Sequence, residues 1–112
     1  MELAGGYWPH FPYPDLAPFY DIWQPMTYYT YRVKGRQDVY DYTRLNTQIL
    51  RDETGDPNLP IHHIGGIASQ SSGLETAGFV DAILDDGLTG GSIYDMGLTD
   101  AKDWAQLERL VP

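Results

Sequence analysis

At 112 residues the chain can form at most one domain with a modest core, and its hydrophobic fraction of 42% is typical of a folded globular protein. The net charge of -9, with only seven Lys and Arg, argues against nucleic-acid binding, because phosphate recognition depends on clustered basic side chains. The absence of cysteine excludes disulfides and thiolate chemistry, and no apolar run reaches the roughly 18 residues of a membrane span.

The first half of the chain predicts one clear strand followed by one helix. Residues 2–7 are a possible further strand, and the proline-rich residues 8–14 fit neither a helix nor a strand. Residues 21–28 are apolar, aromatic and of strand length. After a polar loop, residues 38–52 carry apolar side chains at helical spacing and end near Gly55, a typical helix stop.

The rest of the chain repeats this strand–helix plan twice. Residues 60–67 predict a short buried strand, and residues 74–86 predict a helix. Residues 92–94 form the core of a third strand, and Asp100 is a suitable N-cap for a last helix. The buried stripe of that helix is predicted to hold Trp104, Leu107 and Leu110.

This alternation predicts parallel strands joined by right-handed crossovers. The expected fold class is α/β, a partial (β/α) barrel in which three to four parallel strand–helix units form one half-barrel domain over residues 1–112. A complete barrel takes about 250 residues. Because an open arc has two unpaired sheet edges, the half-barrel is expected to need a partner, which is a second copy, a separate chain or a missing N-terminal half. A small open α/β domain standing alone is the alternative.

Candidate site residues follow from the rule that function gathers at the carboxyl ends of parallel strands. The rule selects Gln24, Met26, Tyr28, Tyr29, Tyr94 and Asp95, together with residues 62–66. His62 and His63 are adjacent on a strand and point to opposite faces, so they cannot easily share a metal ion. One of the two is expected to face the interior and contact a substrate, and His63 is the candidate. No metal or cofactor is predicted.

Two strand motifs resemble the family 18 chitinases and related lysozyme-like barrels. Residues 25–28, Pro-Met-Thr-Tyr, are similar to the Met-x-Tyr strand of that family, and residues 90–95, Gly-Gly-Ser-Ile-Tyr-Asp, are similar to its final strand. The resemblance implies that Met26 and Tyr28 line a sugar site and that Tyr94 stands where these chitinases usually place a Trp. Tyr29 occupies the position of an Asp in the family, and its acidic motif Asp-x-x-Asp-x-Asp-x-Glu does not occur in these residues.

The resemblance implies a carbohydrate-binding, hydrolase-like chain without its own catalytic acid. Trp8, Tyr28 and Tyr94 are expected to stack on or hydrogen-bond a saccharide, and Gln24 and Asp95 to hold its hydroxyl groups. Asp95 is the best-placed catalytic carboxylate, but cleavage needs a pair, so any hydrolysis would require completion by another chain. The rival hypothesis is a structural or protein-interaction subunit, since Tyr and Trp are also enriched at protein interfaces. Neither hypothesis involves nucleic acid or a membrane.

Overall fold

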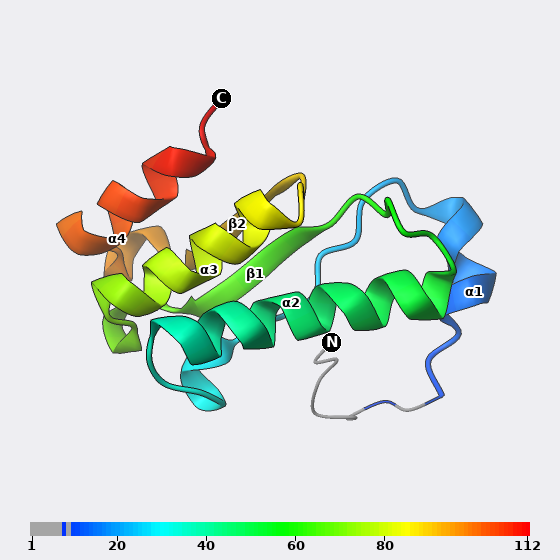
Figure 1. The fold of residues 1–112 in the computed structure, drawn as a ribbon, viewed down its shortest axis with the longest axis horizontal. Coiled ribbons are helices and arrows are strands. Elements are labelled where there is room, and N and C mark those ends of the chain that lie inside the picture. Colours follow the sequence, from blue (N-terminus) through cyan, green and yellow to red (C-terminus); the bar gives the residue numbers. More distant parts are fainter. Residues whose placement is uncertain (1–7, 9) are drawn as a thin grey trace.

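The computed structural model describes residue 8 and residues 10–112, which fold into a helical layer packed on a small parallel sheet (Figure 1). The helices are α1 (Tyr13–Leu16), α2 (Arg36–Thr54), α3 (Gly73–Asp85) and α4 (Ala101–Leu107), and the strands are β1 (His62–Ile67) and β2 (Gly90–Tyr94). Single 3-10 turns η1 to η5 cover Ala17–Phe19, Tyr29–Tyr31, Ala68–Gln70, Met96–Leu98 and Glu108–Leu110. The possible strand at residues 2–7 lies outside the described residues.

Local signals in the sequence explain where the three longer helices begin and end. α2 stops at Gly55, whose φ of 71° is the left-handed conformation that glycine adopts without strain. Ser72 and Glu75 form a reciprocal capping box at the start of α3, in which each side chain accepts a hydrogen bond from the other residue's backbone N–H. Asp100 caps α4 by accepting from the Lys102 N–H, as the sequence predicts.

The sheet consists of β1 and β2, which pair in parallel with His62 opposite Gly90 and Ile64 opposite Ser92. The predicted strand at residues 21–28 is reduced to two isolated parallel bridges, Trp23 with Ile61 and Met26 with Ile64. The carbonyl of Pro25 accepts from the Ile64 N–H at 3.0 Å. Because the nitrogen and the carbonyl of one residue point to the same side of a parallel strand, the Pro25 nitrogen also faces β1, but it carries no hydrogen to donate. This missing ladder bond interrupts the strand at its centre.

The half-barrel prediction is therefore wrong. The described residues form four α-helices and a two-stranded sheet rather than three to four strand–helix units. Helices α2 and α3 lie side by side along β1 and β2 (Figure 1), on the face toward which Gly65 and Gly91 turn. A Cβ at either glycine would press on the Phe79 ring of α3, so the glycines allow the close approach of sheet and helix.

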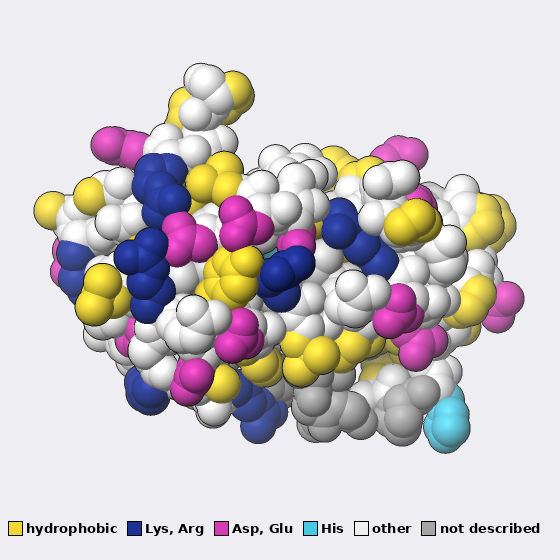
Figure 2. Space-filling view, in the orientation of Figure 1, with side chains coloured by type: hydrophobic (Ala, Val, Ile, Leu, Met, Phe, Trp, Pro, Cys, Tyr) yellow, Lys and Arg dark blue, Asp and Glu magenta, His cyan; other side chains and the backbone are white. Residues whose placement is uncertain are grey.

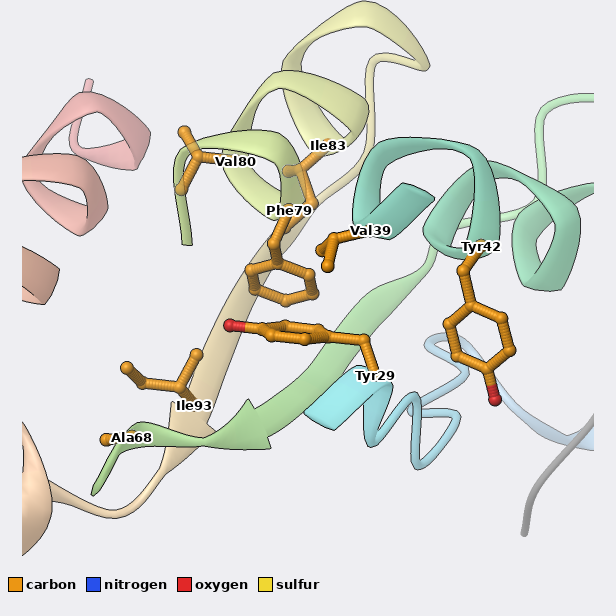
Figure 3. Packing of buried hydrophobic residues seen from close by; sticks show 8 residues of the cluster. All are labelled: Tyr29, Val39, Tyr42, Ala68, Phe79, Val80, Ile83 and Ile93. Atoms are coloured by element: carbon orange, nitrogen blue, oxygen red, sulfur yellow. The ribbon is translucent and has the colours of Figure 1, made fainter. Parts of the chain in front are cut away.

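The core lies between the sheet and these two helices (Figure 3). Its centre is the pair Tyr29 and Phe79, both without solvent exposure, with ring centroids 5.5 Å apart. The other buried members of this cluster are Val39, Tyr42, Ala68, Val80, Ile83 and Ile93. A second cluster, made by Tyr13, Leu50, Leu59 and Ile61, lies under the α1 end of the molecule.

Charged side chains gather on the outer face of the helical layer, where basic and acidic groups alternate (Figure 2). Asp81 of α3 accepts from Arg36 at the start of α2 and from Arg109 near the end of the chain, both at 2.7 Å. Arg44 pairs with Asp86 at 3.0 Å. None of the described helices is long and apolar enough to cross a membrane.

Candidate functional site

Within the described residues, one face of the sheet has no helix over it and carries exposed side chains from three neighbouring segments. Thr27 points to the helical side, where its hydroxyl bonds His63, so alternation directs Met26 to the opposite side. On β2, Gly91 and Ile93 turn toward the helices, which directs Ser92 to the open side. We call this surface the uncovered sheet face, and its residues are Gln24, Met26, His62, Ile64, Ser92 and Tyr94.

A groove with a volume of about 490 Å³ runs along the free edge of β2, and we call it the β2 groove. The described residues that line it are His62, Thr89, Gly90, Gly91, Ser92, Ile93, Met96, Thr99, Trp104, Leu107, Leu110 and Val111. Leu107 and Leu110 also pack against the core cluster that holds Ile83, so α4 and η5 form a wall on the helical side. The groove adjoins the uncovered sheet face through His62 and Ser92.

The two adjacent histidines point to opposite sides of the sheet, as the alternation predicts. His62 lies on the uncovered sheet face, with its Nε2 3.4 Å from the Ser92 hydroxyl oxygen, and partial burial lowers its pKa. His63, the predicted substrate contact, has no exposed surface. His62 is thus the histidine that a ligand on this face can reach.

His63 is held between two threonine hydroxyls in the core. Its Nδ1 lies 2.7 Å from Thr27 Oγ1 and its Nε2 lies 2.8 Å from Thr47 Oγ1. Because Thr47 donates its only hydroxyl hydrogen to the Thr43 carbonyl, it must accept from Nε2–H, which leaves Nδ1 as the acceptor from Thr27. Burial, together with the nearby charges of His62 and Arg51, lowers the pKa of His63 to about 3, so the ring is neutral at neutral pH.

A chain of buried hydroxyl groups, which the sequence did not reveal, joins the core to α4. The Tyr29 hydroxyl lies 2.9 Å from Ser71 Oγ, which lies 3.0 Å from Thr76 Oγ1. Thr76 donates to the fully buried carboxylate of Asp103 at 2.7 Å, and Lys102 bonds the second carboxylate oxygen at 3.0 Å. Burial is the main cause that raises the pKa of Tyr29. These groups satisfy one another and are closed to a ligand.

The remaining predicted site residues lie at different places. Gln24, Met26 and Tyr94 share the uncovered sheet face, while Tyr28 is half-buried and its ring packs edge-on against Tyr31 at 6.3 Å. Tyr29 is sealed in the core and cannot touch a ligand in this conformation. The structure therefore brings together three of the predicted residues.

Trp8 and Asp95 lie apart from these three. Trp8 is 57% exposed and packs against Phe11 at 5.1 Å, within a row of rings that leads through Tyr13 to Trp23. Asp95 follows β2 directly through a cis peptide bond, is half-buried, and its carbonyl accepts from the Thr99 hydroxyl at 2.7 Å. Trp8 therefore belongs to the aromatic cluster at the α1 end, and Asp95 to the turn after β2.

The side chains around the β2 groove determine which contacts a ligand could make there. The described lining residues include no Asp or Glu, whereas glycoside cleavage uses two carboxyl groups that flank the scissile bond. Within the described part of the chain, no three His, Asp or Glu side chains are grouped so that they could hold a metal ion. Hydroxyl, imidazole, indole and aliphatic groups remain, and these supply apolar contact and a few hydrogen bonds.

Comparisons with protein-family models, with curated proteins and with solved structures each give no match to this chain. The likeness to family 18 chitinases consequently rests on the two short strand motifs alone.

Proposed function

We propose that the chain is a protein-binding module that docks a partner over the uncovered sheet face and the β2 groove. The observation that carries this proposal is the run of exposed apolar side chains on that side of the molecule. Met26 and Tyr94 are 40% and 51% exposed on the sheet, and Met96, Trp104 and Val111 are 79%, 44% and 72% exposed along the groove. Exposed apolar surface gathered in one place marks an interaction site.

The distribution of charge supports the same proposal. The ion pairs of Asp81 and Asp86 lie on the outer face of the helices, on the other side of the molecule from the uncovered sheet face. The described lining of the β2 groove, in contrast, holds no Asp, Glu, Lys or Arg in a chain with 23 such residues, 16 acidic plus seven basic. Depletion of charge at the centre of a patch is characteristic of protein interfaces.

Carbohydrate binding on the same surface is the second candidate function. Tyr94 offers an exposed ring for stacking, and the Gln24 amide, the His62 imidazole and the Ser92 hydroxyl lie on the same face as hydrogen-bonding groups. The apolar character of the groove wall favours a protein partner over a sugar, because sugars present many hydroxyl groups that would lose water without a replacement bond.

Site-specific photo-cross-linking tests the proposal. A benzophenone amino acid replaces Met26 or Met96 in two variants, and a matched control carries it at Leu45, which is 50% exposed on the outer side of α2. We expect one protein from the source organism to cross-link from both test positions, and the same protein, once purified, to bind the unlabelled chain. Cross-linking that is no stronger from Met26 and Met96 than from Leu45 would contradict the proposal.

Titration calorimetry with chito-oligosaccharides and peptidoglycan fragments tests the second candidate. Binding heat that disappears in Tyr94→Ala, together with failure of the cross-linking experiment, would replace the protein-binding proposal by carbohydrate binding. Tyr31→Ala, another exposed tyrosine, is the matched control and should bind a sugar as the wild type does.

A further inference from the structure

Strand β2 has one edge occupied by β1 and one edge that faces the β2 groove. In β1 the His62 and Ile64 N–H groups donate to the Trp23 and Pro25 carbonyls, so the backbone groups of His63 point to the other side, toward β2. Backbone groups of alternate residues point to opposite sides of a strand. Gly91 lies opposite His63, and in a parallel pair His63 bonds the residues on either side of Gly91, so the N–H and C=O groups of Gly91 and Ile93 point away from β1. Among the described residues no strand pairs with this edge.

The shape of the β2 groove matches one further strand. The five residues of β2 extend over about 16 Å at a rise of roughly 3.3 Å each. A strand placed beside them would point every second side chain toward the wall formed by Trp104, Leu107 and Leu110. The intervening side chains would continue the uncovered sheet face beyond Ser92. Apolar residues suit the first set, and the second set is free to be polar.

A second copy of this chain fits the groove poorly. Its β2 would bring along its own α3, because Gly91 lies directly under Phe79 and Ile83. On that same side of the groove α4 and η5 are already in place, since Leu107 packs on the core cluster. Two chains with a net charge of -9 also repel each other. An extended segment that carries no helix of its own avoids both problems.

Resting on the proposed protein-binding function, we infer that the β2 groove binds an extended segment of a partner protein, which adds to β2 as a further strand. The segment is apolar at alternate positions, to cover Trp104 and Leu107, and is flanked by Lys or Arg. Because the described lining of the groove is uncharged, the central residues of the segment are expected to be uncharged as well. The net negative charge of the chain attracts basic residues at the two ends of the segment. Main-chain hydrogen bonds to Gly91 and Ile93 supply affinity, and the apolar wall supplies selectivity.

A phage-displayed library of random ten-residue peptides is the probe. We expect panning against the folded chain to enrich peptides with alternating apolar residues and basic flanks. The best peptide is then synthesised with a fluorescent label, and its affinity is measured by anisotropy. Panning that enriches no such pattern would overturn the inference.

Methylation of single backbone nitrogens in the synthetic peptide separates strand addition from general contact with the face, and it leaves the folded chain unchanged. A strand beside β2 directs the N–H groups of alternate residues toward β2, so methylation of those nitrogens should weaken the peptide about tenfold or more. Methylation of the intervening nitrogens, the matched control, should leave the affinity within about twofold of that of the unmethylated peptide.

Equal binding of all the methylated peptides would overturn strand addition. In that case a partner found by photo-cross-linking would still support the protein-binding function, while this inference fell. If no partner cross-linked at all, the proposed function would fall first. Light scattering that shows a dimer broken by the unmethylated peptide would identify a second copy as the occupant and refute the partner segment.

Discussion

Acidification from pH 7.5 to pH 5 should destabilise the fold by about 2 kcal/mol through His63 alone. The pKa of this imidazole is 6.5 in the unfolded chain and about 3 in the core. Between these two values the unfolded state binds a proton that the folded state does not, so the free energy of unfolding falls as the pH falls. At pH 5 the difference is about 1.5 pH units, and each unit corresponds to about 1.36 kcal/mol.

Urea unfolding followed by tryptophan fluorescence at pH 7.5, 6.5 and 5 measures this loss. This range lies above the ordinary pKa of carboxyl groups, which limits their contribution. His63→Gln should be less stable than the wild type at pH 7.5, because it disturbs the bonds to Thr27 and Thr47, yet it should lose about 2 kcal/mol less on acidification. The control His10→Gln changes an exposed histidine and should follow the wild type.

A His63→Gln variant that loses as much stability between pH 7.5 and pH 5 as the wild type would refute this reasoning. It would mean that the buried ring is not the group that takes up the proton on unfolding. The half-buried His62, whose pKa is also lowered, would then be the next group to test.

Two further predictions concern packing and buried polar groups. Gly78→Ala places a methyl group against the Arg36 carbonyl and should lower the free energy of unfolding by about 2 to 3 kcal/mol. In the control Gly73→Ala the nearest neighbour of the new methyl group is the Lys102 side chain at 3.4 Å, and the free energy of unfolding should change by under about 0.5 kcal/mol. Equal losses of stability by the two variants in urea titrations would contradict this prediction. Thr76→Val removes the hydroxyl that donates to the buried Asp103 carboxylate at 2.7 Å, and it should lower the free energy of unfolding by about 1 to 3 kcal/mol in the same titrations. Thr76→Ser keeps the hydroxyl and should lower the free energy of unfolding clearly less.

Elements with a regular apolar period could be predicted closely from the sequence. The helix predicted at residues 74–86 is found at Gly73–Asp85, and the strand predicted at residues 60–67 is found at His62–Ile67. The prediction at residues 21–28 failed because it counted apolar residues, and Pro25 takes away a hydrogen bond that a central strand needs. With that strand lost, the predicted half-barrel had no third unit on which to build.

The candidate site could be predicted only in part, because hydropathy does not identify buried polar residues. Leu45 belongs to the apolar spacing of α2, yet it is half exposed. The face of α2 toward the sheet also buries Thr43, Asn46 and Thr47, and of these Thr47 pairs with His63 on β1. Alternation showed that one of the two adjacent histidines faces the open side, but only the position of the helices decides that it is His62.

The hydroxyl chain from Tyr29 to Asp103 has a consequence for the rate at which the β2 groove would recruit its ligand. Displacing α4 would break the hydrogen bond from Thr76 of α3 to the buried Asp103 carboxylate of α4, so this wall of the groove is held in place before any encounter. The loss of conformational freedom then falls on the incoming segment alone. Stiffening that segment in an extended shape should speed association, whereas loosening the receptor should not.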